Sequence, residues 1–139
     1  MYLLDTNVVS ELRNLRIAEP AVIAWSRQHN GDHFFLSAVT VFELERGALR
    51  ALRRDERKGT MLRSWINDYV LPIFKGRILT FDVDVALRCA AMHMPDPRPE
   101  RDSMIAATAS IHGLTVATRN VADFEACGVP VFNPWLYPA

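Results

Sequence analysis

The feature that most constrains the fold is an alternation between short, wholly apolar runs and longer segments with helical spacing. The first apolar run, residues 2–4, leads directly into Asp5 and then into a segment whose apolar residues recur at helical intervals. Strands that are apolar throughout and alternate with helices are typical of a parallel sheet covered on both faces. The sequence therefore predicts an α/β fold with three layers, α/β/α.

The same pattern predicts where the individual elements lie. The predicted strands are residues 2–4, 33–36, 78–81, 114–117 and 129–132. The predicted helices are residues 6–15, 20–30, 39–54, 57–70, 82–91, 99–112 and 123–126. Pro72 is expected to end a helix, Pro99 to begin one and Gly113 to end it. At 139 residues the chain is expected to form a single domain, residues 1–139.

The charge balance excludes a protein that is drawn as a whole to polyanions or membranes. Basic and acidic residues number 16 each, so the formal net charge is zero. Most of the basic residues are arginines, and many fall between Arg46 and Arg63. A nucleic-acid partner would therefore be held by a local patch, for which the candidates are Arg46, Arg50, Arg53, Arg54, Arg57 and Lys58. For most of them we expect instead an ordinary solvated helix face.

Cysteine usage and hydropathy bear on the compartment. Cys89 and Cys127 lack metal-ligand spacing and are expected to be ordinary buried residues, although the sequence leaves a disulfide open. Asp5 interrupts any signal-peptide core, and no apolar run approaches the length of a membrane span. We therefore expect a cytoplasmic protein with no membrane partner.

Four acids occupy the same kind of position in the predicted fold. Asp5, Glu43, Asp102 and Asp123 are each expected in or just before the first turn of a helix. Taken singly, each is equally well explained as a helix cap, and residues 40–43 fit a capping box. Taken together they predict a site, because Asp5 and Asp123 follow strands while the other two open neighbouring helices. All four can then project to the carboxyl edge of the sheet, where ligands bind in open α/β folds.

Carboxylates gathered in one cleft repel each other and raise each other's pKa unless a cation is present. Oxygen ligands without His or Cys suit a hard ion, which indicates Mg²⁺ or Mn²⁺. Such a site suits hydrolysis of a phosphodiester by a metal-activated water, without a nucleophilic Ser, Cys or His.

With these acids identified, the chain resembles the PIN-domain nucleases, specifically the VapC-type toxins of toxin–antitoxin pairs and their FitB-like branch. Four ordered segments carry the resemblance: residues 3–12, 36–47, 102–109 and 117–124, with Asn133-Pro134-Trp135 near the end. Residues 93–101 depart from it, because they form a short proline-rich segment where relatives often have a longer loop. Because of this departure, the resemblance does not predict the local shape of the substrate groove.

The resemblance implies a five-stranded parallel sheet in the order 3-2-1-4-5 and a Mg²⁺- or Mn²⁺-dependent endoribonuclease. It further implies a homodimer, an RNA substrate, and a cognate antitoxin that inserts a segment at the active site. By motif, Asp5, Glu43 and Asp102 match the core metal ligands and Asp123 the fourth acid. The substrate or antitoxin contacts are expected to be Thr6, Asn7, Arg46, Thr118, Arg119 and Asn120.

The tryptophans and histidines are expected to have structural roles rather than roles in binding or catalysis. Trp25, Trp65 and Trp135 are expected to be core or interface anchors rather than base-stacking platforms. The histidines, which share no ligand spacing, are expected to be structural or exposed: His29, His33, His93 and His112.

Two alternatives to the nuclease remain open. A PIN-like binding module without activity, acting in a regulatory complex, ranks below it because all four acids are present. A phosphatase or phosphoacceptor with Asp5 as nucleophile ranks lower still, because Asn7 stands where a second aspartate is needed.

Overall fold

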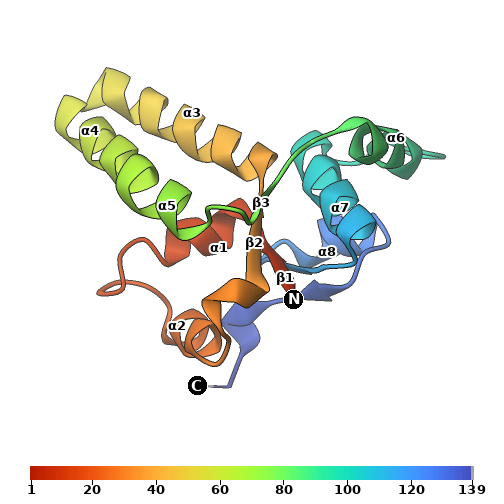
Figure 1. Ribbon diagram of the computed structural model, residues 1–139, viewed down its shortest axis with the longest axis horizontal. Helices are drawn as coiled ribbons and strands as arrows, with labels where there is room; N and C mark the ends of the chain where they lie inside the picture. Colours follow the sequence, from red (N-terminus) through yellow and green to blue (C-terminus); the bar gives the residue numbers. More distant parts are fainter. Residues whose placement is uncertain (139) are drawn as a thin grey trace.

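Five short parallel strands form the sheet at the centre of the protein, for which the computed structural model describes residues 1–138 (Figure 1). The strands are β1 (Tyr2–Leu4), β2 (Phe34–Ser37), β3 (Ile78–Leu79), β4 (Thr115–Ala117) and β5 (Val131–Phe132). They lie side by side in the order β3-β2-β1-β4-β5, and all four pairings are parallel. The predicted α/β class and strand order are therefore confirmed.

Five of the eight α-helices within residues 1–138 form two groups on either side of the carboxyl edge of this sheet. The eight are α1 (Thr6–Glu11), α2 (Pro20–Arg27), α3 (Ala38–Arg54), α4 (Glu56–Trp65), α5 (Leu71–Ile73), α6 (Val83–Met92), α7 (Glu100–His112) and α8 (Val121–Glu125). In Figure 1, α3, α4 and α5 extend to one side and α6 and α7 to the other. None of the helices within residues 1–138 is long and apolar enough to cross a membrane.

Several helix boundaries differ from the prediction: α2 ends at Arg27 rather than near residue 30, and α8 begins at Val121 rather than at Asp123. Two further differences are larger. The first helix ends at Glu11 rather than near residue 15, because the chain turns at Asn14, whose side chain accepts the N–H of Arg16 and whose carbonyl accepts the N–H of Ala18, both at 3.1 Å. Pro72 does not end the fourth helix. The chain widens into a π-helical turn at Ile66–Val70 and then continues into α5, which contains Pro72. A wider turn accommodates a ring that cannot donate a backbone hydrogen bond.

The start of α3 also corrects the prediction for Glu43. Ser37 caps this helix, its hydroxyl accepting the N–H of Val39 at 3.0 Å. Glu43 therefore lies in the second turn, and residues 40–43 do not form a capping box. Asp102 and Asp123 do lie in the first turns of α7 and α8, and Asp5 is the N-cap of α1, as predicted. Pro99 is the N-cap of α7 rather than its first residue, and Gly113 ends that helix with a φ of 66°.

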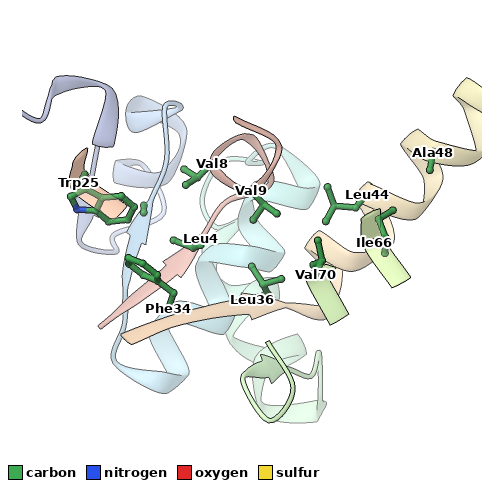
Figure 2. Close-up of a cluster of buried hydrophobic side chains, with 11 residues drawn as sticks. Leu4, Val8, Val9, Trp25, Phe34, Leu36, Leu44, Ala48, Ile66 and Val70 are labelled. Atoms are coloured by element: carbon green, nitrogen blue, oxygen red, sulfur yellow. The ribbon is translucent and has the colours of Figure 1, made fainter. Parts of the chain in front are cut away.

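Both faces of the sheet are buried under apolar side chains. Successive residues of β1 point to opposite faces, so Leu4 joins one cluster and Leu3 the other. Figure 2 shows the first cluster, which extends from Trp25 and Phe34 to the junction of α3 with the chain after α4, at Leu44, Ala48, Ile66 and Val70. The second lies under α7 and α8 and contains Val39, Ile105, Ala106, Ala109, Leu114, Val116, Phe124 and Val129.

The pairing of α3 with α4 depends on a glycine. A Cβ at Gly59 would lie 2.3 Å from the Cα of Leu52, so only a glycine allows the two backbones to approach this closely.

The disulfide that the sequence left open is not formed: both thiols are free, Cys89 buried and Cys127 partly exposed.

Candidate functional site

Asp5 is fixed at the point where β1 gives way to α1. Its backbone N–H donates to Ala117 of the neighbouring strand at 2.9 Å, and its side chain is 4 % exposed. Oδ1 accepts the N–H of Thr6 at 2.8 Å, and Oδ2 accepts the hydroxyl of Thr118 at 2.7 Å. Burial raises the pKa of this carboxyl above its ordinary value, the two hydrogen bonds oppose the rise, and the charge of Glu43 adds to it. Asp5 is therefore a buried carboxylate held in one orientation.

Glu43 reaches the same place from α3. The hydroxyl of Thr6 donates to Glu43 Oε1 at 2.7 Å and lies 3.2 Å from the hydroxyl of Thr40, which is fully buried. Position 43 therefore faces the sheet from the second turn of the helix, one turn beyond Thr40. The helix N-terminus stabilises its negative charge less than a first-turn position would.

Asp102 brings the third carboxylate from α7, on the opposite side of the edge. Burial, the largest cause, raises its pKa to about 6 together with the charges of Asp5, Asp123 and Glu43 and a hydrogen bond to Asp123 when the group is protonated. The four predicted acids, which come from four different elements, thus act on one another electrostatically. Asp102 lies close enough to Asp5, Asp123 and Glu43 for their charges to act on it.

Asp123 and the remaining predicted contacts surround this group. Asp123 is exposed in the first turn of α8. The buried hydroxyl of Thr118 accepts the N–H of Asn120 at 2.9 Å and lies 3.5 Å from the side-chain nitrogen of Asn7. Thr118 therefore links Asp5 to the loop that leads to Asp123.

The two predicted basic contacts lie against aromatic rings. The guanidinium carbon of Arg46 lies 5.2 Å from the centre of the Phe42 ring, and that of Arg119 lies 5.1 Å from the Trp135 ring. Neither arginine forms an ion pair with an acid in the part of the chain that the structure describes. Within residues 1–138 the one ion pair joins Arg63 to Glu45, at 3.1 Å. The four acids are therefore not neutralised by ion pairs with neighbouring arginines.

The donor chemistry fits a hard divalent cation, because the ligands are carboxylate and hydroxyl oxygens without a neutralising side chain. The side chains are not arranged as a finished metal site, however. No three His, Cys, Asp or Glu residues in the described chain converge on a single ion position. Binding an ion would therefore require side-chain rotation, for which the exposed Asp123 and half-buried Asp102 have room.

Sequence reasoning missed a set of supporting residues beside Asp102. His93 Nε2 lies 2.9 Å from the hydroxyl of Ser103, which donates to the Glu100 carbonyl at 2.6 Å. His93 Nδ1 accepts the N–H of Arg98 at 3.2 Å, so His93 ties the proline-rich segment to the start of α7. Ser103 could have been found from the sequence, because it directly follows Asp102. Its contact with His93 could not, because nothing in the sequence pairs the two residues. The fully buried Thr40 was missed too, although it lies one helical turn before Glu43.

The comparisons with known proteins agree with this geometry. The chain is 42 % identical to the VapC ribonuclease Y4jK of Sinorhizobium fredii, over 97 % of this chain and 98 % of that protein. It is 42 % identical to the toxin FitB of Neisseria gonorrhoeae, over 97 % and 99 % of the two chains. The crystal structure of FitAcB from Neisseria gonorrhoeae superposes with a TM-score of 0.88 at 40 % identity, covering 98 % of this chain and 99 % of that one.

Residues 2–127 match the PIN domain family, a span that contains β1 to β4 and all four acids. This match includes most of the chain, and relatives that are more than 30 % identical span nearly its whole length. The protein therefore belongs to the PIN-domain family.

Proposed function

We propose that this protein is a divalent-metal-dependent endoribonuclease and the toxin of a toxin–antitoxin pair in the cytoplasm. The observation that carries the proposal is that one residue, Thr6, holds two acids from different elements: its N–H donates to Asp5 at 2.8 Å and its hydroxyl to Glu43 at 2.7 Å. Burial and the charges of Asp5, Asp123 and Glu43 also raise the pKa of Asp102 to about 6. Such crowding destabilises a protein unless a cation offsets it. The relatives named a ribonuclease and a toxin supply the reaction class.

In this proposal Asp5, Glu43 and Asp102 hold Mg²⁺ or Mn²⁺, with Asp123 as a fourth acid. The bound ion would lower the pKa of a coordinated water and offset charge on the phosphoryl oxygens. The chain's own residues orient these ligands. Thr118 and the Thr6 N–H hold Asp5 in place, and the Thr6 hydroxyl holds Glu43.

Substrate or antitoxin contacts are proposed for four more residues. Asn7, on α1, and Asn120, the N-cap of α8, both lie beside Thr118. Arg46 and Arg119 carry unneutralised charge at the rim, where they suit a phosphate or a carboxylate.

The experiment is cleavage of a labelled RNA with Mg²⁺ or Mn²⁺, with EDTA, and in single-residue variants. We expect EDTA to stop cleavage, and Asp5→Asn or Asp102→Asn to lower the rate by about 100-fold or more, as when one transition-state-stabilising group is lost. Asp84→Asn is the matched control, because Asp84 is exposed in the first turn of α6. Full cleavage by both site variants would remove the four acids as the cause.

The second candidate is an inactive PIN-like binding module. The observation that favours it is that no three acids, histidines or cysteines within residues 1–138 converge on one ion position. Such a module would cleave no RNA with either metal, and its thermal stability would not respond to Mn²⁺.

We also infer that the partner is an antitoxin protein and that the toxin forms homodimers. An apolar cavity of about 530 Å³ between α1 and the chain after α4 supports a protein partner. Its lining includes Leu12, Trp65 and Val70, together with Arg13. Tyr69 and Ile73, which also line it, are 63 % and 57 % exposed. Co-expression with the product of the neighbouring reading frame should give one complex, and Ile73→Asp should prevent it.

A further inference from the structure

A hollow of about 390 Å³ lies between α6, α7 and the turn that follows α8, the three helices on the right side of Figure 1. Its charged lining residues are Arg88 of α6 and Arg98 of the proline-rich segment, and no acid of the described chain lines it. None of the four acids of the candidate metal site therefore belongs to this hollow. It is a second polar site, of opposite charge.

Arg98 brings a partly buried guanidinium whose charge the chain itself does not compensate. Its Nε is buried without a hydrogen-bond partner, and the group forms no ion pair with an acid of residues 1–138. Burial raises the pKa of the Cys127 thiol and the charge of Arg98 opposes the rise, so the two side chains lie close together in the lining. A partly buried positive charge without a counter-charge costs stability. An anion at the outer nitrogens of Arg98 would offset that cost.

Arg88 adds a second guanidinium, which a hydroxyl group orients. Its Nη1 donates to the hydroxyl of Ser110, near the end of α7, and Ser110 lines the same hollow. A hydroxyl that accepts one hydrogen bond still has its own proton to donate. Arg88 forms no ion pair within residues 1–138 either. The hollow therefore presents two positive charges and several donors to whatever enters it.

We propose that this hollow binds a phosphate group, held by the guanidinium groups of Arg88 and Arg98, with the Ser110 hydroxyl as a further donor. A guanidinium group donates two parallel hydrogen bonds that match a pair of phosphate oxygens. Since none of the four acids takes part, the phosphate site is independent of the nuclease function proposed above.

Two features favour a phosphate over a carboxylate. A phosphate monoester carries up to two negative charges and three acceptor oxygens, which suits two cations and a hydroxyl better than the single charge of a carboxylate. Met92 and Met94 add apolar surface to the lining, against which the organic part of a phosphate ester could pack. The phosphate could come from a small molecule, such as inorganic phosphate or a nucleotide, or from the backbone of an RNA.

The test is a calorimetric titration of the metal-free protein at constant ionic strength, without divalent ions that would bring phosphate to the four acids. The probes are inorganic phosphate, adenosine 5′-monophosphate and adenosine. We expect the two phosphates to bind saturably and adenosine not to bind. Arg98→Gln and Arg88→Gln should each weaken phosphate binding by about 10-fold or more, the loss for one hydrogen bond to a charged group. Arg57→Gln removes an equal charge from an exposed position on α4 and, as the control, should match the wild type.

The place of binding is tested through Cys127, which lines the hollow and is partly exposed, whereas Cys89 is buried. Phosphate should slow the alkylation of Cys127 in the folded wild type, compared with chloride at the same ionic strength, but not in Arg98→Gln. Each protein is compared with itself, because loss of Arg98 also changes the pKa of the thiol. Calorimetric binding without protection of Cys127 would place the phosphate elsewhere and overturn the proposal.

The source of the phosphate is decided with a labelled single-stranded RNA under the same conditions. Unchanged RNA affinity in Arg88→Gln and Arg98→Gln would assign the site to a small phosphate ligand, and a parallel loss in both would assign it to the RNA backbone. Undiminished phosphate binding in both variants, or an equal loss in Arg57→Gln, would overturn the proposal. Because Arg88 is exposed, its variant tests the site even if Arg98→Gln folds poorly.

Discussion

The two ends of the central strand β1 have opposite effects on the stability of the fold. At its amino end Tyr2 packs edge-on against Trp25, with ring centres 5.1 Å apart and planes at 82°, and Trp25 stacks on Phe132 at 5.7 Å and 26°. At its carboxyl end, three residues later, Asp5 is buried among other acids. The aromatic end buries large apolar surfaces, which stabilises the fold, whereas the acid end collects like charges, which destabilises it.

The difference shows which residues serve folding and which do not. The aromatic end is complete without a ligand, apart from the indole N–H of Trp25, which is buried without a partner in the described chain. The acid end lacks this internal compensation, because its carboxylates have hydroxyl and N–H partners but form no ion pair with an arginine or lysine within residues 1–138. A ligand is expected where the folded state keeps like charges together although they lower its stability.

The largest effect should come from the aromatic end. Trp25→Ala removes a side chain that is 1 % exposed and should lower the free energy of unfolding by about 3–5 kcal/mol, from lost burial and the cavity left behind. Urea denaturation followed by circular dichroism measures it. In whatever fraction stays folded, Mn²⁺ binding should be unchanged, and a loss of metal binding there would show that the two ends are not independent.

The next effect tests the residue that links Asp5 to the loop of Asp123. Thr118→Val leaves the N–H of Asn120 unpaired and removes a hydrogen bond from Asp5, so it should cost about 1–3 kcal/mol of stability and weaken Mn²⁺ binding. Thr108→Val is the matched control, because Thr108 is equally buried but its hydroxyl donates within α7, to the Met104 carbonyl at 2.9 Å. Equal metal affinity in the two variants would contradict the role given to Thr118.

The smallest effect concerns the pH dependence of stability in EDTA. The folded-state pKa of Asp102 is about 6, above its ordinary value of 3.8, so the folded protein binds this proton more tightly than the unfolded chain. Its contribution to stability should therefore rise as the pH falls from about 7 to 4, by on the order of 1 kcal/mol after solvent screening of a half-exposed group. The difference in unfolding free energy between the wild type and Asp102→Asn should narrow or reverse over that interval. If the difference in unfolding free energy between the two proteins does not change with pH, the raised pKa of Asp102 is contradicted.

The aromatic and acid ends also differ in how far the sequence predicted them. The apolar runs were enough to predict the α/β class, and the family resemblance supplied the strand order. Asp5 was predictable because a strand, an acid and a helix follow one another within a few residues. Glu43 was misplaced by one turn because Ser37, at the end of β2, caps α3 earlier than the pattern of residues 40–43 suggested.

Contacts between distant elements were beyond sequence reasoning. Phe42 and Arg101 meet because α3 and α7 converge at the carboxyl edge, and His93 meets Ser103 because the proline-rich segment folds back on α7. Their positions next to Glu43 and Asp102 were visible in the sequence. The first contact depended on packing between α3 and α7, whose residues 42 and 101 are far apart in the chain, and the second on the path of the proline-rich segment, ten residues from His93 to Ser103.

The most direct test of the acid end is a calorimetric titration of the metal-free protein with Mn²⁺. The wild type and Asp84→Asn should bind saturably, with Asp102→Asn showing little or no binding. At a metal concentration 100 times the dissociation constant, the first two should gain about 2.7 kcal/mol of stability. Absence of binding by the wild type, or equal binding by Asp102→Asn, would contradict the claim that these four acids form a cation site.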